Sequence, residues 1–201
     1  MPSYEFENAA REKGFVNICG VDEAGRGPLA GNVVAGAVIM PQGLIIDGLD
    51  DSKKLSEKKR EALYEIITEK TIWSVAWATP AEIDAYNILG ATMLAMKRAI
   101  EGLPQKADYA LIDGNRAKGF DIPLETIVKG DSKSFSIAAA SIIAKVTRDR
   151  QCLELDRKYP EYGFAIHKGY PTKAHMEAVI KLGPCPEHRK SFLSFVGRAK
   201  K

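Results

Sequence analysis

Short apolar runs along the chain alternate with segments of helical periodicity. Residues 17–21, 33–40 and 72–79 are rich in apolar and β-branched side chains, so each is expected to form a strand. Residues 56–70 carry apolar side chains at helical spacing, which predicts a helix between the second and third strands. Three early strands joined by short connections predict an antiparallel meander.

Strands and helices alternate in the second half of the chain. We expect strands at 109–112 and 126–128, followed by a long helix at 134–156. The small residues 138–141 in the middle of that helix would allow it to approach a sheet closely. Strand–helix alternation is typical of parallel additions to a sheet, so the predicted fold class is a mixed α/β layer fold.

Two helices carry clear start signals. Thr79, Pro80 and Glu82 form the pattern of a capping box with proline at the first helical position. The helix that they open would place four apolar side chains on one face, those of Leu89, Met93, Met96 and Ile100. A last helix is expected to open at Pro171-Thr172 and to end at Gly183-Pro184.

Length and composition indicate one soluble globular domain. The chain has 201 residues, of which 45% are hydrophobic and 27% charged, and its formal net charge is +3. A charge this small means that any nucleic-acid footprint must come from local clusters of basic residues. A charged N-terminus and the lack of a long apolar run favour a cytoplasmic protein without a membrane segment. The three scattered cysteines favour neither a disulfide scaffold nor a thiolate zinc site.

Four acidic residues stand where predicted strands end. Asp22 and Glu23 follow the first strand, Asp113 follows the strand at 109–112, and Asp131 follows the strand at 126–128. Ligands of open α/β sheets bind at the carboxyl ends of strands, and four acids meeting there would need a cation between them. Oxygen ligands of this kind suit Mg²⁺ or Mn²⁺. The alternative is that Asp113 and Asp131 are ordinary turn residues.

A glycine-rich turn follows the acidic pair. Residues 25–30 (GRGPLA) fit the letters of a dinucleotide-binding motif, but a β-branched segment follows instead of a helix, which excludes that reading. Gly25, Arg26 and Gly27 would instead let the backbone pass close to a ligand, with Arg26 available for a phosphate. A tight hairpin turn is compatible with this role.

Basic and aromatic side chains gather in three places. Lys53 lies in one basic cluster, and Lys145 and Arg148 lie in another on the long helix; each cluster either contacts phosphates or forms a solvated face. Residues 167–172 (HKGYPT) form a loop in which Tyr170 could stack on a sugar or base, or pack beside the last helix. The three histidines lack zinc spacing, so structural or phosphate-contacting roles are expected.

Five segments of the chain together resemble the bacterial ribonuclease HII family. They run in family order: 20–29 (GVDEAGRGPL), 51–56 (DSKKLS), 111–115 (LIDGN), 128–132 (VKGDS) and 167–172 (HKGYPT). The resemblance implies a ribonuclease H-like fold, with a five-stranded mixed sheet flanked by helices. It also implies one catalytic domain over 1–201, whose last ~30 residues form C-terminal helices packed on it.

The resemblance also assigns roles to residues. Asp22, Glu23, Asp113 and Asp131 match the catalytic quartet that binds Mn²⁺ or Mg²⁺. Gly25, Arg26, Gly27 and Tyr170 match the elements that recognise the RNA–DNA junction. Further substrate contacts are implied for Lys53, Asn115, Arg116, Ser132, Lys145 and Arg148.

The implied activity is that of a two-metal endonuclease. It would hydrolyse the RNA strand of RNA–DNA hybrids and cut 5′ to ribonucleotides embedded in duplex DNA, leaving a 3′-hydroxyl and a 5′-phosphate. A monomer with a role in ribonucleotide excision repair and DNA replication is expected. Residues 191–196 resemble a clamp-binding motif only loosely. Two rival hypotheses are a non-catalytic nucleic-acid binder and a metal-dependent phosphatase for small molecules.

Overall fold

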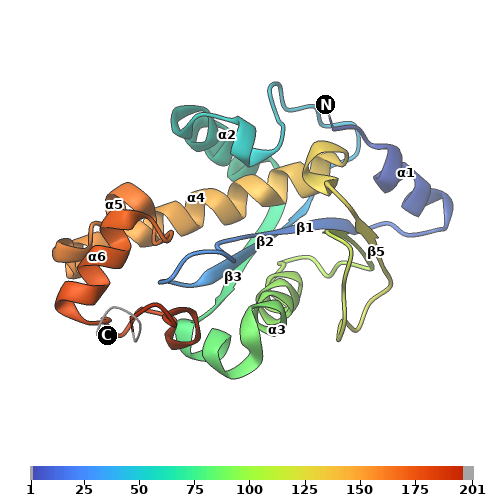
Figure 1. Ribbon diagram of the computed structural model, residues 1–201. Helices are drawn as coiled ribbons and strands as arrows, with labels where there is room; N and C mark the ends of the chain where they lie inside the picture. Colours follow the sequence, from blue (N-terminus) through green and yellow to red (C-terminus); the bar gives the residue numbers. More distant parts are fainter. Residues whose placement is uncertain (1, 197–201) are drawn as a thin grey trace.

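A five-stranded mixed sheet forms the centre of the protein in the computed structural model, which describes residues 2–196 (Figure 1). β1 pairs antiparallel with β2 and β2 with β3, while β4 lies parallel to β1 and β5 parallel to β4. This arrangement, with helices on both faces, confirms the predicted fold class. The strand order across the sheet is β3 (Ile72–Ala78), β2 (Val33–Ile39), β1 (Ile18–Ala24), β4 (Tyr109–Asp113), β5 (Leu124–Ile127).

The connection between β2 and β3 differs from the predicted short link. It contains a 3-10 helix, η1 (Ser52–Lys54), and the expected helix, α2 (Glu57–Lys70), which packs beside the long helix through Leu63 and Ile67. The two strands still pair antiparallel, because a full ladder of partners joins them independently of the length of the connection. The prediction of a meander was therefore correct in pairing and wrong in connection length.

Two large helices enclose the sheet. α4 (Phe135–Lys158) crosses one face, and α3 (Pro80–Glu101) covers the other (Figure 1). A Cβ at Gly20 would collide with the backbone of α4, and a Cβ at Gly36 would lie 2.6 Å from the carbonyl oxygen of Ala140. The helix thus packs directly on the strand backbones, as its run of small residues predicts.

The capping box at the start of α3 is present. The Thr79 hydroxyl accepts from the Glu82 N–H, and the Glu82 carboxylate accepts from the Thr79 N–H. Asn87 interrupts the helix with a φ of 58°, and its side chain accepts from two N–H groups of the next turn. The four apolar residues expected on one face all follow this kink; Met96 and Ile100 are buried, whereas Leu89 and Met93 are half-buried.

Short elements follow α4 at one end of the sheet (Figure 1). Thr172 caps α6, which ends at Gly183 as expected. The chain then reaches the loop between β1 and β2 through an isolated bridge between Ala30 and His188. Within residues 2–196, none of the helices combines the length and the apolar character needed to span a bilayer. Residues 197–201 of the predicted C-terminal helical region lie outside the described residues. The elements are η3 (Pro160–Tyr162), α5 (Phe164–His167), α6 (Lys173–Leu182) and η4 (Lys190–Phe192).

An N-terminal helix, α1 (Glu5–Glu12), was not predicted. Glu7 lies on its buried side, where its carboxylate accepts from the Ser134 and Ser136 hydroxyls and from the Ser136 N–H at the start of α4. A carboxylate at a helix N-terminus satisfies free N–H groups and complements the helix dipole. Tertiary contacts of this kind hold a helix that is too short to be stable alone.

Candidate active site

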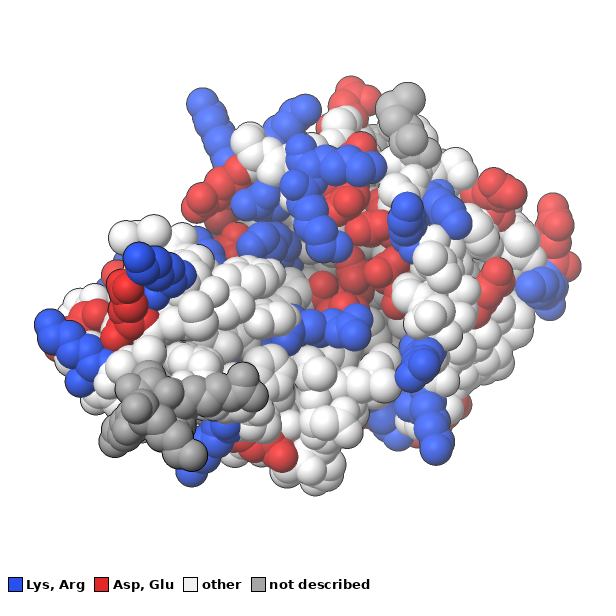
Figure 2. Space-filling model, viewed as in Figure 1, with Lys and Arg blue, Asp and Glu red and all other residues white. Residues whose placement is uncertain are grey.

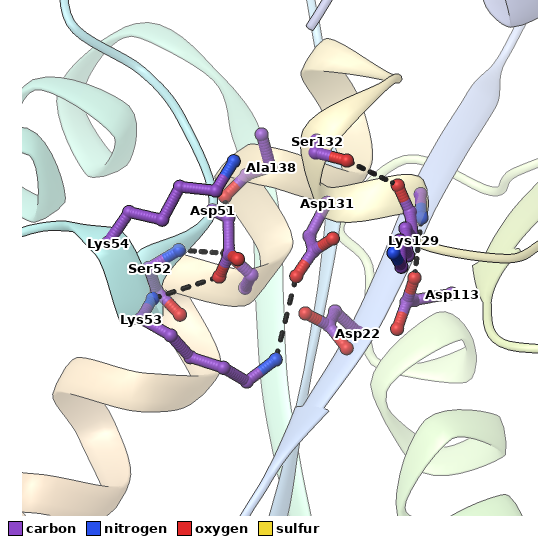
Figure 3. Close-up of polar contacts among 12 residues, drawn as sticks. Asp22, Asp51, Ser52, Lys53, Lys54, Asp113, Lys129, Asp131, Ser132 and Ala138 are labelled. Carbon is purple, nitrogen blue, oxygen red and sulfur yellow. Dashed lines mark hydrogen bonds and ion pairs between the residues drawn. The ribbon is translucent and has the colours of Figure 1, made fainter. Parts of the chain in front are cut away.

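Adjacent parallel strands bring two of the predicted acids together. Val21 of β1 pairs with Ile112 of β4, so the next residues along the two strands, Asp22 and Asp113, lie side by side. Asp131 comes from η2 (Gly130–Ser132), a 3-10 helix between β5 and α4. Figure 3 shows these three carboxylates facing the same space.

Strand geometry also separates the acidic pair. Side chains alternate between the faces of a strand, and Val21 packs in the core on the side of α3. Glu23 shares that side, whereas Asp22 points to the side of α4. The prediction that Asp22 and Glu23 follow the first strand was wrong by three residues, because β1 continues to Ala24 and contains both acids.

A strained turn places Asp131 beside Asp113. Lys129 has a φ of 57°, an uncommon value for a residue with a side chain, and the Gly130 N–H then donates to Asp113 Oδ1 at 2.6 Å. A Cβ at Gly130 would lie 2.6 Å from Ile137 Cδ1 and 3.3 Å from Asp113 Oδ1, so a larger residue would have to displace neighbouring side chains. The turn therefore holds the Asp113 carboxylate in place and brings Asp131 next to it.

Two of the four acids are almost fully buried, which is unfavourable for an ionised carboxylate. Asp22 is only 2% exposed and Asp131 only 5%. Burial, together with the charges of Glu23 and Asp113, raises the pKa of Asp22 well above its usual range. Burial also raises the pKa of Glu23 and of Asp131, and Asp113 adds to both shifts. The cluster thus holds more negative charge than its protein surroundings neutralise.

Two basic side chains offset part of this charge. Lys53 Nζ lies 3.5 Å from Asp131 Oδ2, and Arg26 Nη1 lies 3.3 Å from Glu23 Oε1. Partial burial alone would lower the pKa of Lys53, but Asp22 and Asp131 raise it. Figure 2 shows acidic side chains gathered in a central hollow with basic ones beside it.

The sequence reading did not single out Asp51, although it lies in one of the family segments. Its carboxylate accepts from the Lys53 N–H and so caps η1, the element that carries Lys53 (Figure 3). The charge of Asp51 also contributes to the raised pKa of Asp131. Asp51 therefore orients the lysine and adds to the negative charge of the cluster.

The donor set fits a divalent cation such as Mg²⁺ or Mn²⁺. Asp22, Glu23, Asp113 and Asp131 offer only hard oxygen ligands. The raised pKa values of Asp22, Glu23 and Asp131 indicate that the cluster lacks positive charge. As the side chains stand, no three acids, histidines or cysteines of residues 2–196 surround a single point as metal ligands. The fit rests on the chemistry of the donors and on their mutual repulsion.

The glycine-rich turn lies next to Tyr170. Gly25 has a φ of 97°, and a side chain at this position would run into Arg148. A Cβ at Gly27 would lie 3.6 Å from Tyr170 Cε1, so the turn and the ring are neighbours. Tyr170 is 43% exposed, which leaves much of its ring open. Loop and ring form one continuous surface beside the acids.

Two recesses adjoin the acids. The first is a cavity of about 210 Å³, and the second is one of about 230 Å³ that includes Asn115 and Arg116. Both are lined by Glu23 and Arg26, so they meet at the glycine-rich turn. Ser132 lies next to Asp131, and its hydroxyl donates to the Lys129 carbonyl of the turn. The predicted residues that line the first cavity are Glu23, Gly25, Arg26, Gly27, Lys53, Lys145, Arg148 and Tyr170.

Arg148 corrects the expectation of a phosphate contact. The residue is 2% exposed, and its guanidinium donates to the carbonyls of Ala30 and Lys168 instead of facing solvent. The ring of Tyr170 lies 5.8 Å from its guanidinium carbon. Lys145, on the same helix, pairs with Asp149 at 2.7 Å. Arg148 is therefore packed against the loops that contain Ala30 and Lys168, beside the first cavity.

The fold and the acids together are typical of one class of protein. A mixed sheet with acidic residues at the ends of its central strands, in a hollow flanked by basic side chains, is the architecture of a metal-dependent nuclease of the ribonuclease H type. The family model described as Ribonuclease HII matches residues 19–195. The chain belongs to the ribonuclease HII family. It is a metal-dependent ribonuclease of the hydrolase class, and it acts on RNA–DNA hybrids as an endonuclease.

Individual relatives agree with this assignment. The chain is 60% identical over 176 residues to ribonuclease HII of Dechloromonas aromatica, covering 87% of this chain and 90% of that protein. It is 58% identical over 178 residues to ribonuclease HII of Laribacter hongkongensis, with the same two coverages. The crystal structure of ribonuclease H2 from Pyrococcus horikoshii matches with a TM-score of 0.75 at 28% identity, covering 92% of this chain and 100% of that one.

Proposed function

We propose that the chain cuts the phosphodiester bond on the 5′ side of a ribonucleotide, leaving a 3′-hydroxyl and a 5′-phosphate. The substrates are RNA–DNA hybrids and duplex DNA that contains single ribonucleotides. The observation that carries this proposal is the position of the turn at 25–27 and of Tyr170 directly beside the acids. In this proposal the turn and the ring read the sugar beside the acids that cut the backbone, because Glu23 lines the same cavity as both.

The acids provide the chemistry in this proposal. Two divalent cations, Mg²⁺ or Mn²⁺, would be held by the quartet Asp22, Glu23, Asp113 and Asp131; when bound they supply Lewis acidity at the phosphate and lower the pKa of the attacking water. Gly130 holds the Asp113 carboxylate in place through its N–H. Burial of Asp22 excludes bulk water from its side of the cluster and strengthens every electrostatic interaction there.

Lys53 adds a movable positive charge. Its side chain is 71% exposed although its ammonium reaches Asp131. The ammonium is therefore free to approach a non-bridging phosphate oxygen when a duplex enters the hollow. Arg26 stands in the same relation to Glu23 on the opposite side of the acids. The side chains of Lys53 and Arg26 would therefore lie on either side of the scissile phosphate.

Recognition of ribose requires a contact to the 2′-hydroxyl. The N–H groups of Arg26 and Gly27 make no hydrogen bond within residues 2–196, so both are free to donate. The exposed ring of Tyr170 lies beside Gly27 and would pack flat on the next sugar when that sugar lacks a 2′-hydroxyl.

Cleavage of three matched duplexes tests the proposal. They are a DNA duplex with one ribonucleotide, the same duplex without it, and an RNA–DNA hybrid, each incubated with Mg²⁺, Mn²⁺ or EDTA. We expect cuts 5′ to the ribonucleotide and within the hybrid, dependent on the cation, and no cut in plain DNA. The exposed, ion-paired residue Asp121 supplies a control in Asp121→Asn, which should cut like wild type.

Two other outcomes contradict the proposal. Tight binding of the ribonucleotide duplex without cleavage in any cation would identify a non-catalytic binder. Hydrolysis of p-nitrophenyl phosphate without cleavage of the duplexes would identify a small-molecule phosphatase.

A further inference from the structure

We propose that Arg189 is a positioning residue that sets the peptide planes of the loop at 25–32 and thereby determines selectivity for ribonucleotides. The inference rests on the proposed function, because it assigns the cause of the loop geometry that would read the sugar. Arg189 lies in the segment before η4, far along the chain from the loop. It does not touch substrate in this scheme and acts through the loop alone.

The guanidinium of Arg189 is fully buried under the loop. A guanidinium has five N–H groups, and here all five donate to loop carbonyls. No carboxylate among residues 2–196 forms an ion pair with it. Its acceptors and distances are Gly25 (2.6 Å), Arg26 (3.0 Å), Pro28 (2.8 Å), Gly31 (2.9 Å) and Asn32 (3.1 Å).

These bonds decide where the loop N–H groups point. The described peptide bonds are all trans, so the carbonyl of one residue and the N–H of the next point in opposite directions. Because the carbonyls of Gly25 and Arg26 turn inward to Arg189, the N–H groups of Arg26 and Gly27 turn away from it. Neither of these N–H groups has an acceptor among residues 2–196, and Arg26 and Gly27 both line the first cavity.

The coupling between Arg189 and the loop is rigid for an electrostatic reason. A buried cation is tolerated only while dipoles or charges compensate it, and here the loop carbonyls are the compensation. Burial and the neighbouring Arg148 lower the pKa of Arg189 to about 9, so it remains a cation at neutral pH. Any peptide plane that flipped outward would leave part of this charge unpaired.

Backbone contacts connect this assembly to Tyr170. The Arg189 N–H donates to the Leu29 carbonyl at 2.8 Å, and the Leu29 N–H donates to the Gly169 carbonyl at 2.8 Å. Gly169 directly precedes Tyr170, so the two recognition elements share one hydrogen-bonded frame. Arg189 therefore fixes the spacing between the loop at 25–32 and Tyr170.

Arg189→Lys tests the proposal with a basic side chain that is also long and flexible. Lysine has at most three donors and no planar fork, so it cannot hold five carbonyls. Two quantities are measured with Mg²⁺: kcat/KM for the duplex with one ribonucleotide, and the inhibition constant of the same duplex without it. We expect kcat/KM to fall about 100-fold, as for a misplaced recognition group, and the inhibition constant to change less than about threefold.

A control variant separates positioning from general destabilisation. Ile67 is fully buried between α2 and α4, away from the loop, so Ile67→Ala lowers the melting temperature without touching the recognition surface. Below its melting temperature it should keep both quantities near the wild-type values. A folded Arg189→Lys that also keeps the wild-type kcat/KM would overturn the inference while leaving the proposed function intact.

The wild-type protein supplies a second test if Arg189→Lys does not fold. Backbone ¹⁵N relaxation reports the order parameters of the Arg26 and Gly27 amides, which should equal those of rigid backbone, about 0.85. Values below about 0.6 would mean that Arg189 does not hold these planes, and the inference would be wrong. Failure of the wild-type protein to cut the ribonucleotide duplex would overturn the proposed function and this inference with it.

Discussion

The ammonium of Lys53 lies 3.5 Å from the carboxylate of Asp131, although one comes from η1 after β2 and the other from the turn after β5. Figure 3 shows this ion pair at the edge of the acid cluster, beside Asp22. A lysine so placed compensates the acids only in part, since the pKa of Asp131 remains raised. The site is therefore built around charge that a bound cation must neutralise.

Asp22→Asn should abolish cleavage and leave the fold intact. The amide oxygen can still accept from the Glu23 N–H, as Asp22 Oδ1 does now at 2.7 Å. The loss of activity should exceed about 100-fold, the upper range for losing an outer partner of a metal ligand. Binding of the ribonucleotide duplex, measured by fluorescence anisotropy, should stay within a few-fold of wild type. Activity near the level of the Asp121→Asn control would contradict the metal-ligand assignment.

Divalent cations should stabilise the protein against heat, and more so at higher pH. Because the folded-state pKa values of Asp22, Glu23 and Asp131 are raised, the stability of the metal-free protein falls as pH rises through them. A cation at 100 times its Kd would add about 2.7 kcal/mol to the free energy of unfolding. Each kcal/mol raises the melting temperature of a protein of this size by roughly 2–4 °C. Melting curves with and without Mn²⁺ at pH 5 and pH 8 measure this. An equal shift in Asp22→Asn would place the cation elsewhere.

The buried histidines should make the fold sensitive to mild acid. The Cys185 N–H donates to His188 Nδ1, so His188 donates from Nε2 to His175 Nε2, and His175 donates from Nδ1 to the Tyr170 carbonyl. Only the neutral rings can form this chain. Burial, and then His175, lower the pKa of His188 from 6.5 to about 4.

A depressed histidine pKa means that stability is lost as pH falls from the unfolded value towards the folded one. Between pH 7 and pH 5 the wild-type protein should lose roughly 2 kcal/mol through His188. Urea unfolding at both pH values, compared between wild type and His188→Gln, isolates this amount from the opposite effect of the acids. The same pH dependence in both proteins would show that His188 does not titrate in this window.

Tyr170→Ala should reduce cleavage at a single ribonucleotide more than cleavage of an all-RNA strand in a hybrid. Stacking contacts are worth about 1–3 kcal/mol, so the selective loss should be one to two orders of magnitude, and Tyr170→Phe should retain activity. The open ring, 43% exposed, favours this reading over a packing role. Equal losses on both substrates with a lowered melting temperature would instead make Tyr170 a packing residue.

Local signals were sufficient for most elements of the fold. The capping box at Thr79 and the N-caps at Ser56, Ser134 and Thr172 start helices where the sequence places them, because these interactions involve residues three positions apart. α1 was missed, since an eight-residue helix is held by contacts with α4 through Glu7 that no local pattern shows.

For the candidate site, the sequence by itself identified the four candidate acids, through their positions at strand ends and the resemblance of their segments to one family. The tertiary structure decided how they meet: the parallel register of β1 and β4 puts Asp22 beside Asp113. It also decided the burial of Arg148 and Arg189, because nothing in the local sequence distinguishes these arginines from surface residues. Their acceptors lie more than a hundred residues earlier in the chain or across another loop, and such contacts exist only after the chain has folded.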